Sequence, residues 1–496
     1  MNVCIITEVL EDTGYGHITR CISLYQAFEQ AGFIPLLIVN ADSKAKQFLK
    51  NFNSVVFDWG SNSKTLQQII GGIKIIVVDS YRAGIDFYEM ISSVSRFPVF
   101  LDDNIRLNYP PSIVVNGTLL AENFNYPNDK NLYLLGTKYI PIRKEFWNIS
   151  TKRINKRINS ILITIGGQDI RNLTPSVLQS VVKIYPAVKK TVVLGKGFTR
   201  ISEIKKSADK NTIFVHDADA RTMNKLMLES DLAVSAGGQT IYELARTGVP
   251  TLAIGVVENQ KINIENWKKT CFIKDVGWWD DKNLFKNLEK KLVEIADYVK
   301  RKKMSEKGKS LVDGLGSKRI VDKIIEQISM KEGFYLRKAM PSDMKKVYTL
   351  SNERLVRTNS VNQNLISWRE HVSWYDKKIH QKNYDFFVAY DCSNFVGQVR
   401  FEIEGYKAII SVSLAKDFRG KGLSYRIISE GSRLIFLNRK NVRKIFAYIR
   451  AENNSSIEAF TKSGYRFLRK EVIDKQQFEI YLLNRSNEQN GINHEI

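Results

Sequence analysis

The first residues with the types and spacing to do chemistry are Gly14-Tyr15-Gly16-His17, followed by Arg20. They lie between a short apolar run at residues 3–6 and an amphipathic run at residues 21–28, which predicts a strand, a tight turn and a helix. Gly14 and Gly16 let backbone N–H groups approach a ligand closely, and a helix N-terminus suits a phosphate. A histidine at this junction can accept a proton near neutral pH. His17 is therefore a candidate general base, and an ordinary glycine turn is the alternative.

Two further glycine pairs follow predicted strands. Gly166-Gly167 ends the apolar run at residues 161–165, and Gly237-Gly238-Gln239-Thr240 joins a strand at residues 231–235 to a helix. The N–H groups of the second turn can cradle a diphosphate. Glu243, one turn into that helix, can accept hydrogen bonds from two ribose hydroxyls. A plain strand-to-helix turn and a solvated helix carboxylate are the alternatives.

A third phosphate-type turn lies near the C-terminus. Arg419-Gly420-Lys421-Gly422-Leu423-Ser424 follows a strand at residues 408–414 and opens a helix. Consecutive N–H groups in such a turn form an anion nest, to which Arg419 and Lys421 would add charge. The sequence therefore predicts a pyrophosphate site here, separate from the first two turns.

The elements that position these residues alternate between strand and helix. Residues 1–146 and 159–280 each predict a parallel sheet with helices on both faces, joined by a polar linker. Ligands of such sheets bind beyond the C-terminal ends of the strands. Residues 281–332 predict a charged helical connector, residues 334–485 an α+β domain, and residues 486–496 a disordered tail.

Composition narrows the class of protein. The chain has 496 residues and a net charge of +23, with no apolar run long enough to span a bilayer. Its start leads directly into a strand, so we expect a cytoplasmic protein without a membrane partner. An anionic small substrate or a lysine-rich coding bias explains the diffuse basic excess, and we do not expect nucleic acid as a partner. The scattered Cys4, Cys21, Cys271 and Cys392 are expected to be free thiols.

Residues 1–280 resemble the UDP-sugar hydrolase of the pseudaminic acid pathway, a family similar to two-domain glycosyltransferases of the GT-B type. The resemblance implies Rossmann-like domains, hydrolysis of UDP-2,4-diacetamido-2,4,6-trideoxy-β-L-altropyranose with His17 as the base, and a sugar pocket lined by Tyr81 and Asn259. Without an evident metal site, we expect backbone N–H groups to support the diphosphate. We interpret Asp102-Asp103 as a turn whose carboxylates cap the backbone or orient His17 or a hydroxyl, with Asp102 among the expected substrate-binding residues, rather than as a metal site. The matching motifs are Gly14-Tyr15-Gly16-His17 with Arg20; Asp79-Ser80-Tyr81; Asp102-Asp103; Leu135-Gly136-Thr137-Lys138-Tyr139 with Arg143 and Phe146; Gly166-Gly167-Gln168-Asp169 with Asn172; Ser235-Ala236-Gly237-Gly238-Gln239-Thr240 with Glu243; and Glu258-Asn259-Gln260.

The third unit resembles the GNAT N-acetyltransferases, on the Arg419–Ser424 turn and on Asn453-Asn454-Ser455-Ser456-Ile457 with Phe460, Lys462, Gly464 and Tyr465. This resemblance implies acetyl-CoA, bound by the turn, by the strand edge at Val412 and Leu414, and by Asn453, for which a helix cap is the alternative. Many members of the family carry a tyrosine at the position of Phe460, where it acts as the general acid toward the thiolate. In this chain Tyr465, Tyr448 or water is left for that role. Glu402 is a candidate base, with an exposed strand carboxylate as the alternative.

Together the two resemblances imply a bifunctional enzyme. It would acetylate the 4-amino group of UDP-4-amino-4,6-dideoxy-N-acetyl-β-L-altrosamine and then hydrolyse UDP from the product. A GT-B glycosyltransferase with an attached acetyltransferase is one alternative. A UDP-sugar sensor that acetylates proteins is the other.

Overall fold

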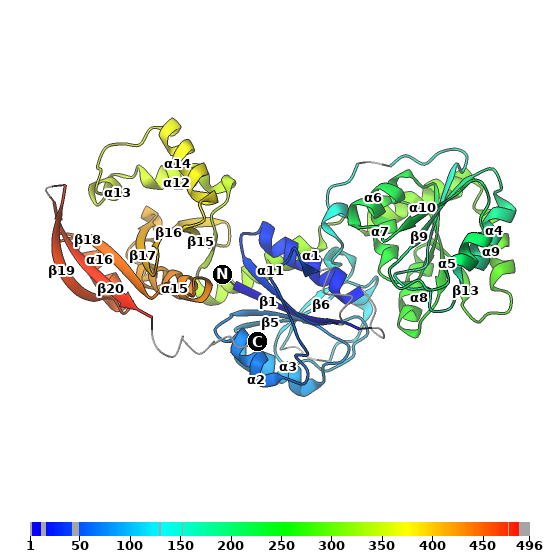
Figure 1. Cartoon of the computed structure of the whole chain (residues 1–496), viewed down its shortest axis with the longest axis horizontal. Helices are drawn as coiled ribbons and strands as arrows, with labels where there is room; N and C mark the ends of the chain where they lie inside the picture. The colour runs from blue at the N-terminus through cyan, green and yellow to red at the C-terminus, as the bar shows by residue number, and fades with distance from the viewer. Residues whose placement is uncertain are drawn as a thin grey trace.

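The computed structural model describes residues 2–10, 16–41, 49–127, 130–150, 152–474 and 476–485. Three sheets, each with its own helices, follow one another along the molecule (Figure 1). The first domain, blue to cyan, lies between the green second domain and the yellow-to-red third domain. Gly14 and the tail at residues 486–496 lie outside the described residues. Within these ranges, no helix combines the length and apolar character needed to span a membrane.

The first domain is a parallel sheet in the order β3-β2-β1-β4-β5-β6-β7. Its central strands are β-branched and buried on both faces, as a helix-covered parallel sheet requires. The chain leaves β1 first toward β2 and later returns to β4 on the other side, so the topological switch lies between β1 and β4. The elements are β1 (Asn2–Val9), α1 (Gly16–Gln30), β2 (Ile34–Ala41), β3 (Ser54–Val56), α2 (Ser63–Ile70), β4 (Ile75–Asp79), α3 (Ile85–Val94), β5 (Phe97–Leu101), β6 (Ile113–Asn116) and β7 (Leu132–Leu135).

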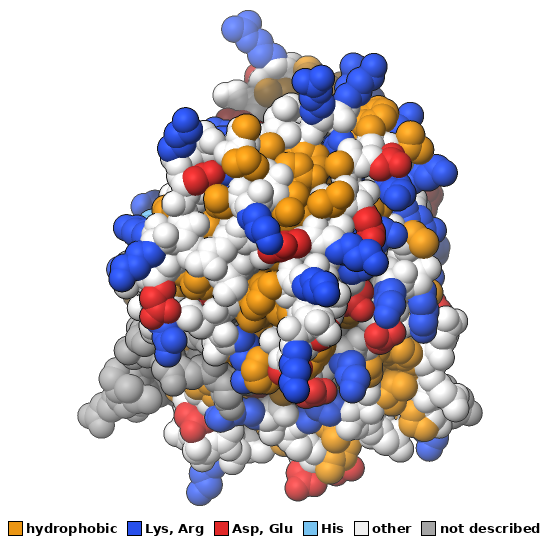
Figure 2. Space-filling model, turned by 90° about the vertical axis from the view of Figure 1, so that its right-hand side faces the viewer, with side chains coloured by type: hydrophobic (Ala, Val, Ile, Leu, Met, Phe, Trp, Pro, Cys, Tyr) orange, Lys and Arg blue, Asp and Glu red, His pale blue; other side chains and the backbone are white. Residues whose placement is uncertain are grey.

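The second domain repeats this plan in the order β10-β9-β8-β11-β12-β13, with its switch between β8 and β11. Both Rossmann-like sheets agree with the predicted GT-B type. Figure 2 shows Lys and Arg side chains spread over one face of the molecule, with acidic and hydrophobic side chains between them. The elements are β8 (Ser160–Thr164), α4 (Thr174–Ile184), β9 (Lys189–Leu194), α5 (Ile201–Lys206), β10 (Thr212–His216), α6 (Ala220–Glu229), β11 (Leu232–Ala236), α7 (Thr240–Thr247), β12 (Thr251–Gly255), α8 (Lys261–Lys269) and β13 (Ile273–Trp278).

The three charged helices after β13 are divided between the two domains. Helix α9 (Leu284–Glu294) packs on α4, and α10 (Tyr298–Leu311) packs on α7. Helix α11 (Gly316–Glu332) instead returns to pack on α1 of the first domain (Figure 1). A glycine starts α11 because a Cβ there would lie 2.1 Å from the Ile140 carbonyl oxygen. The predicted connector thus completes both domains.

The third domain is a mostly antiparallel sheet in the order β14-β15-β16-β17-β18-β20-β19. Strands β17 and β18 are parallel and pair only as far as Ile410 and Ala447, so their later residues leave the sheet open between them. This opening is named the splay below. The elements are β14 (Tyr335–Lys338), α12 (Met344–Ser351), α13 (Arg354–Thr358), α14 (Trp368–His380), β15 (Tyr384–Asp391), β16 (Asn394–Glu404), β17 (Lys407–Leu414), α15 (Leu423–Asn438), β18 (Lys444–Arg450), α16 (Asn454–Lys462), β19 (Arg466–Ile473) and β20 (Gln476–Asn484).

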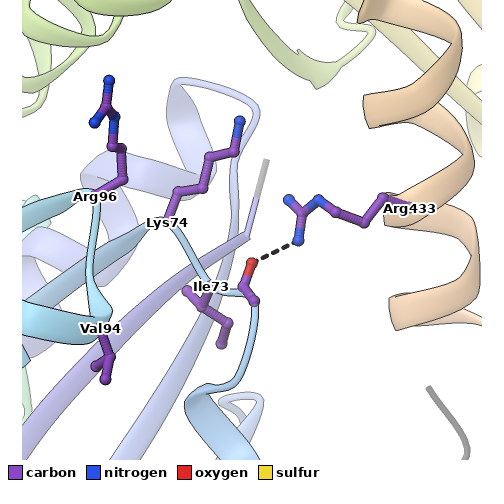
Figure 3. Close-up of a pocket in the computed structure, with 6 residues that line it drawn as sticks. Ile73, Lys74, Val94, Arg96 and Arg433 are labelled. Carbon is purple, nitrogen blue, oxygen red and sulfur yellow. Dashed lines mark hydrogen bonds between the residues drawn. The ribbon is translucent and has the colours of Figure 1, made fainter. Parts of the chain in front are cut away.

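The third domain is docked on the first. The Lys338 N–H donates to the Gly32 carbonyl at 2.6 Å. The Tyr335 ring stacks on Phe33 with ring centroids 5.9 Å apart. Figure 3 shows Arg433 reaching from α15 to the loop before β4, where it donates to the Gly72 carbonyl at 2.5 Å. The two domains therefore share backbone, aromatic and charged contacts.

Candidate active sites

A histidine–carboxylate pair lies at the switch point of the first sheet. His17 is in the first turn of α1, and Asp79 is the last residue of β4. His17 Nδ1 lies 2.6 Å from Asp79 Oδ1, and both side chains are buried. We assign the Nδ1 proton to this bond because Asp79 is the acceptor. That tautomer leaves Nε2 as the ring atom able to accept a proton.

Arg20 completes the electrostatics of the pair. It lies one turn after His17 and donates to both oxygens of Asp79, with Nη2 2.6 Å from Oδ1. Burial opposes ionisation of Asp79, but the charges and hydrogen bonds of Arg20 and His17 hold its pKa well below the usual range. Asp79 is therefore a carboxylate that fixes the histidine.

Tyr81 and Asp103 close this network. Arg20 Nη1 donates to both oxygens of Asp103, at 2.7 and 2.8 Å. The Tyr81 hydroxyl donates to Asp103 Oδ2 at 2.6 Å, and the Tyr81 ring meets His17 edge-on with centroids 4.2 Å apart. The predicted His17, Arg20 and Tyr81 are thus brought together. The predicted Gly16 precedes them, exposed, with no atom within 4 Å of where a Cβ would lie.

Asp102 and Asp103 have different roles. Asp102 is buried, and its oxygens accept the Ile105 N–H at 2.9 Å and the Tyr126 hydroxyl at 2.6 Å. Asp102 therefore shapes the turn after β5, which is the interpretation favoured for the acidic pair. Its neighbour Asp103 makes the contacts to the site.

Glu8 is a functional candidate that sequence reasoning missed. It is fully buried, and its Oε1 accepts the N–H groups of Tyr81 at 2.8 Å and Arg82 at 3.3 Å. Its Oε2 has no hydrogen-bond partner among the described residues. It lines a pocket of about 320 Å³ with Trp59 and Phe87. The available signal was an acidic residue interrupting an otherwise apolar first strand.

The second domain places its glycine turns at its own switch point. Gly166 follows β8 with φ of +97°, a conformation that favours glycine. The neighbouring Gly167 is exposed. Gly237 begins the turn after β11, where a Cβ would lie 2.4 Å from Ile264 Cδ1. Close packing thus requires glycine, and the half-buried Gly238, Gln239 and Thr240 carry the chain into α7.

Glu243 links the two domains. It is buried, and both its oxygens accept from Arg143 of the first domain, each at 2.6 Å. Gln239 also donates across the domains, to the Pro141 carbonyl at 2.9 Å. Glu243, the residue predicted to bind the ribose hydroxyls, is therefore held in a bidentate ion pair. Asn259 lies exposed in the short helix Glu258–Gln260 before α8.

The helix that follows the second glycine turn contacts the first domain. The Tyr242 hydroxyl of α7 accepts the Leu119 N–H at 3.2 Å. Burial raises the pKa of Tyr242, and the charge of Asp103 also raises it. Asn266 of α8 also donates to the Leu119 carbonyl, at 2.9 Å. Helices α7 and α8 of the second domain therefore both contact Leu119 of the first domain.

The Arg419–Ser424 turn of the third domain joins β17 to α15. Gly420 and Gly422 have φ of +73° and +69°, and α15 begins at Leu423 and Ser424. Arg419 braces the turn, because it donates to the Leu414 carbonyl at 2.9 Å and to Glu353 at 2.5 Å. The side chain of Lys421 is exposed.

The other predicted acetyl-CoA residues flank this turn. Val412 and Leu414 lie on β17 beyond its pairing with β18. Asn453 caps α16 by accepting the Ser456 N–H at 3.2 Å. The strand edge therefore borders the splay, and Asn453 has the capping role that its sequence position allows.

Glu402 and Tyr465 lie in different surroundings. Glu402 pairs in register with Ile409, just before the splay, and its 45% exposed side chain accepts from Lys378 at 3.2 Å. Tyr465 is 1% exposed, and its hydroxyl is hydrogen-bonded to Ser432 at 2.8 Å. This burial does not support the predicted acid role for Tyr465. Tyr448, exposed on β18 immediately after Ala447, borders the splay.

Among the residues that the structure describes, no group of three or more His, Cys, Asp or Glu side chains is arranged to hold a metal ion. The four cysteines are free thiols, as predicted.

The fold and these sites define two Rossmann-like domains of GT-B type followed by an acetyltransferase domain, and known proteins agree. Residues 334–466 match the acetyltransferase (GNAT) domain family. The chain is 25% identical to the pseudaminic acid cytidylyltransferase and UDP-2,4-diacetamido-2,4,6-trideoxy-β-L-altropyranose hydrolase of Helicobacter pylori, over 58% of this chain and 51% of that protein. The match thus spans about half of that relative.

Two further matches cover other parts of the chain. The uncharacterized protein MJ1062 of Methanocaldococcus jannaschii is 23% identical over 97% of this chain and 100% of its own length. A Vibrio cholerae spermidine N-acetyltransferase solved with CoA and spermine is 20% identical over 30% of this chain and 95% of its own, with a TM-score of 0.29. The protein thus joins a region similar to a sugar-nucleotide enzyme to a region that matches the acetyltransferase (GNAT) domain family.

Proposed function

We propose that this protein carries out two consecutive steps on a UDP-linked amino sugar. The third domain transfers an acetyl group to the 4-amino group of UDP-4-amino-4,6-dideoxy-N-acetyl-β-L-altrosamine. The first two domains then hydrolyse the product to UDP and the free sugar. The buried His17–Asp79 pair at the sheet switch point carries the hydrolase proposal. The similarity to the Helicobacter pylori protein named for this hydrolase supports it.

In the hydrolytic step His17 Nε2 takes a proton from a water molecule as the water oxygen attacks the anomeric carbon. The bond between that carbon and the UDP oxygen breaks, and the electron pair leaves with UDP. Asp79 stabilises the imidazolium that forms. The Gly238 N–H at the start of α7 stabilises the departing diphosphate, while the Gly237 N–H is already donated to the Ile254 carbonyl at 3.0 Å.

In the acetyl-transfer step the sugar amine attacks the thioester carbonyl of acetyl-CoA. Glu402 takes the proton lost from nitrogen, the carbon–sulfur bond breaks, and the thiolate is protonated by Tyr448 or water. The turn from Arg419 to Ser424, with its two glycines in the left-handed region, binds the CoA pyrophosphate. The strand edge at Val412 and Leu414 pairs with the pantetheine arm.

A coupled assay tests both steps. The UDP-linked 4-amino sugar is incubated with and without acetyl-CoA, and free thiol and UDP are followed. We expect thiol release and then UDP release without any sugar acceptor. UDP release that needs an added acceptor would instead indicate a glycosyltransferase, and thiol release without UDP would contradict the hydrolase.

Two variants separate the sites. His17→Ala should abolish UDP release and spare thiol release, because the base is lost and the third domain is intact. Gly422→Asp should do the reverse, because a side chain and a negative charge enter a left-handed anion turn. Loss of both activities in both folded variants would contradict independent sites.

A further inference from the structure

A buried carboxylate near the His17 network has one oxygen to spare. Glu8, close to the C-terminal end of β1, is fully buried, and its Oε1 accepts the Tyr81 N–H at 2.8 Å. The ring of the same Tyr81 meets His17 edge-on, with ring centroids 4.2 Å apart. The Oε2 atom of Glu8 has no hydrogen-bond partner among the residues that the structure describes. Since a buried carboxylate oxygen without a partner is costly, a donor from outside the chain would stabilise it.

Glu8 lines a pocket of about 320 Å³ at the C-terminal edge of the first sheet, where ligands of parallel sheets bind. Trp59 and Phe87 form an aromatic wall of this pocket, with ring centroids 4.9 Å apart. The Trp59 indole N–H is already donated to the Thr7 carbonyl at 2.8 Å, so the ring offers the pocket apolar surface. The volume is at the lower end of the range for ligand pockets, which suits one sugar ring rather than a whole sugar nucleotide.

The other charged groups of the pocket favour a neutral donor. Asp58, the second carboxylate, already accepts from the Asn40 amide at 2.8 Å and from the Ser61 hydroxyl at 2.5 Å. Arg82 also lines the pocket and brings a positive charge to it. A cationic ligand would face that charge, whereas a neutral N–H or O–H group would not. The group that donates to Glu8 is therefore expected to be uncharged.

Helix α3 supplies the complementary group. Its N-cap residue Gly84 lines the pocket, and no side chain caps the first turn of the helix. The N–H groups of a helix N-terminus suit a carbonyl oxygen. A ligand group that fits therefore has an N–H for Glu8, a carbonyl oxygen for α3 and an apolar end for the wall at Phe87. An acetamido group has all three, whereas a hydroxyl group has only the donor.

We propose that this pocket binds the acetamido-bearing ring of the sugar nucleotide, with Glu8 Oε2 as the acceptor of an acetamido N–H. This rests on the proposed hydrolysis of a UDP-linked diacetamido sugar and adds the residue that recognises the acetamido group. Because Tyr81 contacts both Glu8 and His17, a ring in the pocket is held next to the base. Glu8 binds and selects the substrate, and it takes no part in the proton transfer.

Binding without turnover tests the pocket. In the full chain carrying His17→Ala, calorimetry measures the Kd for UDP-2,4-diacetamido-2,4,6-trideoxy-β-L-altropyranose and the Kd for UDP. Glu8→Gln keeps an oxygen for the Tyr81 N–H and replaces Oε2 with an NH2 group. It should raise the Kd for the sugar nucleotide about 10- to 100-fold and leave the Kd for UDP unchanged. Phe87→Ala should raise the first Kd about 3- to 10-fold, again without an effect on UDP. Glu89→Gln, at an exposed carboxylate of α3, is the matched control and should change neither Kd.

The outcomes separate the pocket from the proposed function. An equal rise in both Kd values would mean that Glu8 only holds the segment at Tyr81, and it would overturn the proposal. An unchanged Kd for the sugar nucleotide in Glu8→Gln would also overturn it, even if the wild type hydrolyses that compound. Tighter binding of the 4-amino precursor than of the diacetamido compound, lost in Glu8→Gln, would assign the pocket to an ammonium group instead. A rise in Kd confined to the sugar nucleotide would support the pocket even if the wild type releases no UDP.

Discussion

At the scale of single residues, the first site depends on one buried carboxylate. Asp79 accepts from both His17 and Arg20, and their charges keep it ionised. Asp79→Asn removes the charge that selects the Nδ1–H tautomer and supports the imidazolium. We expect UDP release to slow by about 10²- to 10⁴-fold, with thiol release unchanged, because a histidine in the wrong tautomer cannot act as the base. A UDP-release assay at saturating substrate measures this.

Asp86→Asn provides the control, since Asp86 is an exposed carboxylate in the first turn of α3. It should leave both rates unchanged. Equal UDP release by wild type and Asp79→Asn would contradict the role of Asp79. Removal of the Asp79 charge also leaves Arg20 with fewer partners, so the melting temperatures of wild type and Asp79→Asn should be compared at the same pH.

At the scale of elements, one ion pair joins α7 to the segment after β7. Arg143→Ala would leave Glu243 buried without its bidentate partner, at a cost of about 3–5 kcal/mol. We expect a clear drop in the calorimetric melting temperature. The Arg143→Ala/Glu243→Gln double variant should recover part of it, because no buried charge then remains unpaired.

Lys302→Ala gives the contrasting case, because it removes a Lys302–Glu306 pair that spans 4.0 Å on the surface. This change should cost less than about 1 kcal/mol. If the double variant at Arg143 and Glu243 melts at the temperature expected from simple addition of the single losses, the two side chains are not energetically coupled.

The elements also show which features local sequence predicts. The β-branched runs of β1 and β4 and the glycine turns after β8 and β17 appear where the pattern places them, because burial on both faces and left-handed backbone leave a local signature. The return of α11 to α1 has no such signature, since its apolar stripe at Ile320, Ile324 and Ile328 indicates a buried face but not the helix that covers it. The spacing of the residues does not tell which of Asp102 and Asp103 contacts Arg20. It also does not tell that one carboxylate oxygen of Glu8 has no hydrogen-bond partner among the described residues. Both depend on side-chain contacts between distant segments.

At the scale of the whole molecule, the third domain is held to the first partly by charge. Lys74, just before β4, lies 2.8 Å from Glu332 of α11 and 3.4 Å from Glu430 of α15. A pocket of about 280 Å³ borders this junction, with Lys74 and Arg433 on facing walls (Figure 3). Since both cations are paired with Glu430, the junction is stabilised by ionised carboxylates.

Acid should therefore weaken this junction. Burial alone would raise the pKa of Glu430, but the hydrogen bonds and charge of Arg433, together with Lys74, lower it to about 2. A carboxyl whose folded pKa lies below its unfolded value stabilises the fold at pH above about 4.5 and loses that contribution as the pH falls toward 2. Glu430→Gln should thus lower the free energy of unfolding at pH 7 by at most about 3 kcal/mol, and the melting temperature with it. The decline of the melting temperature between pH 5 and 3 should be flatter in this variant than in the wild type. Glu458→Gln, on the exposed face of α16, should keep the wild-type slope. Parallel acid profiles for wild type and Glu430→Gln would show that other carboxylates govern the acid stability of the molecule.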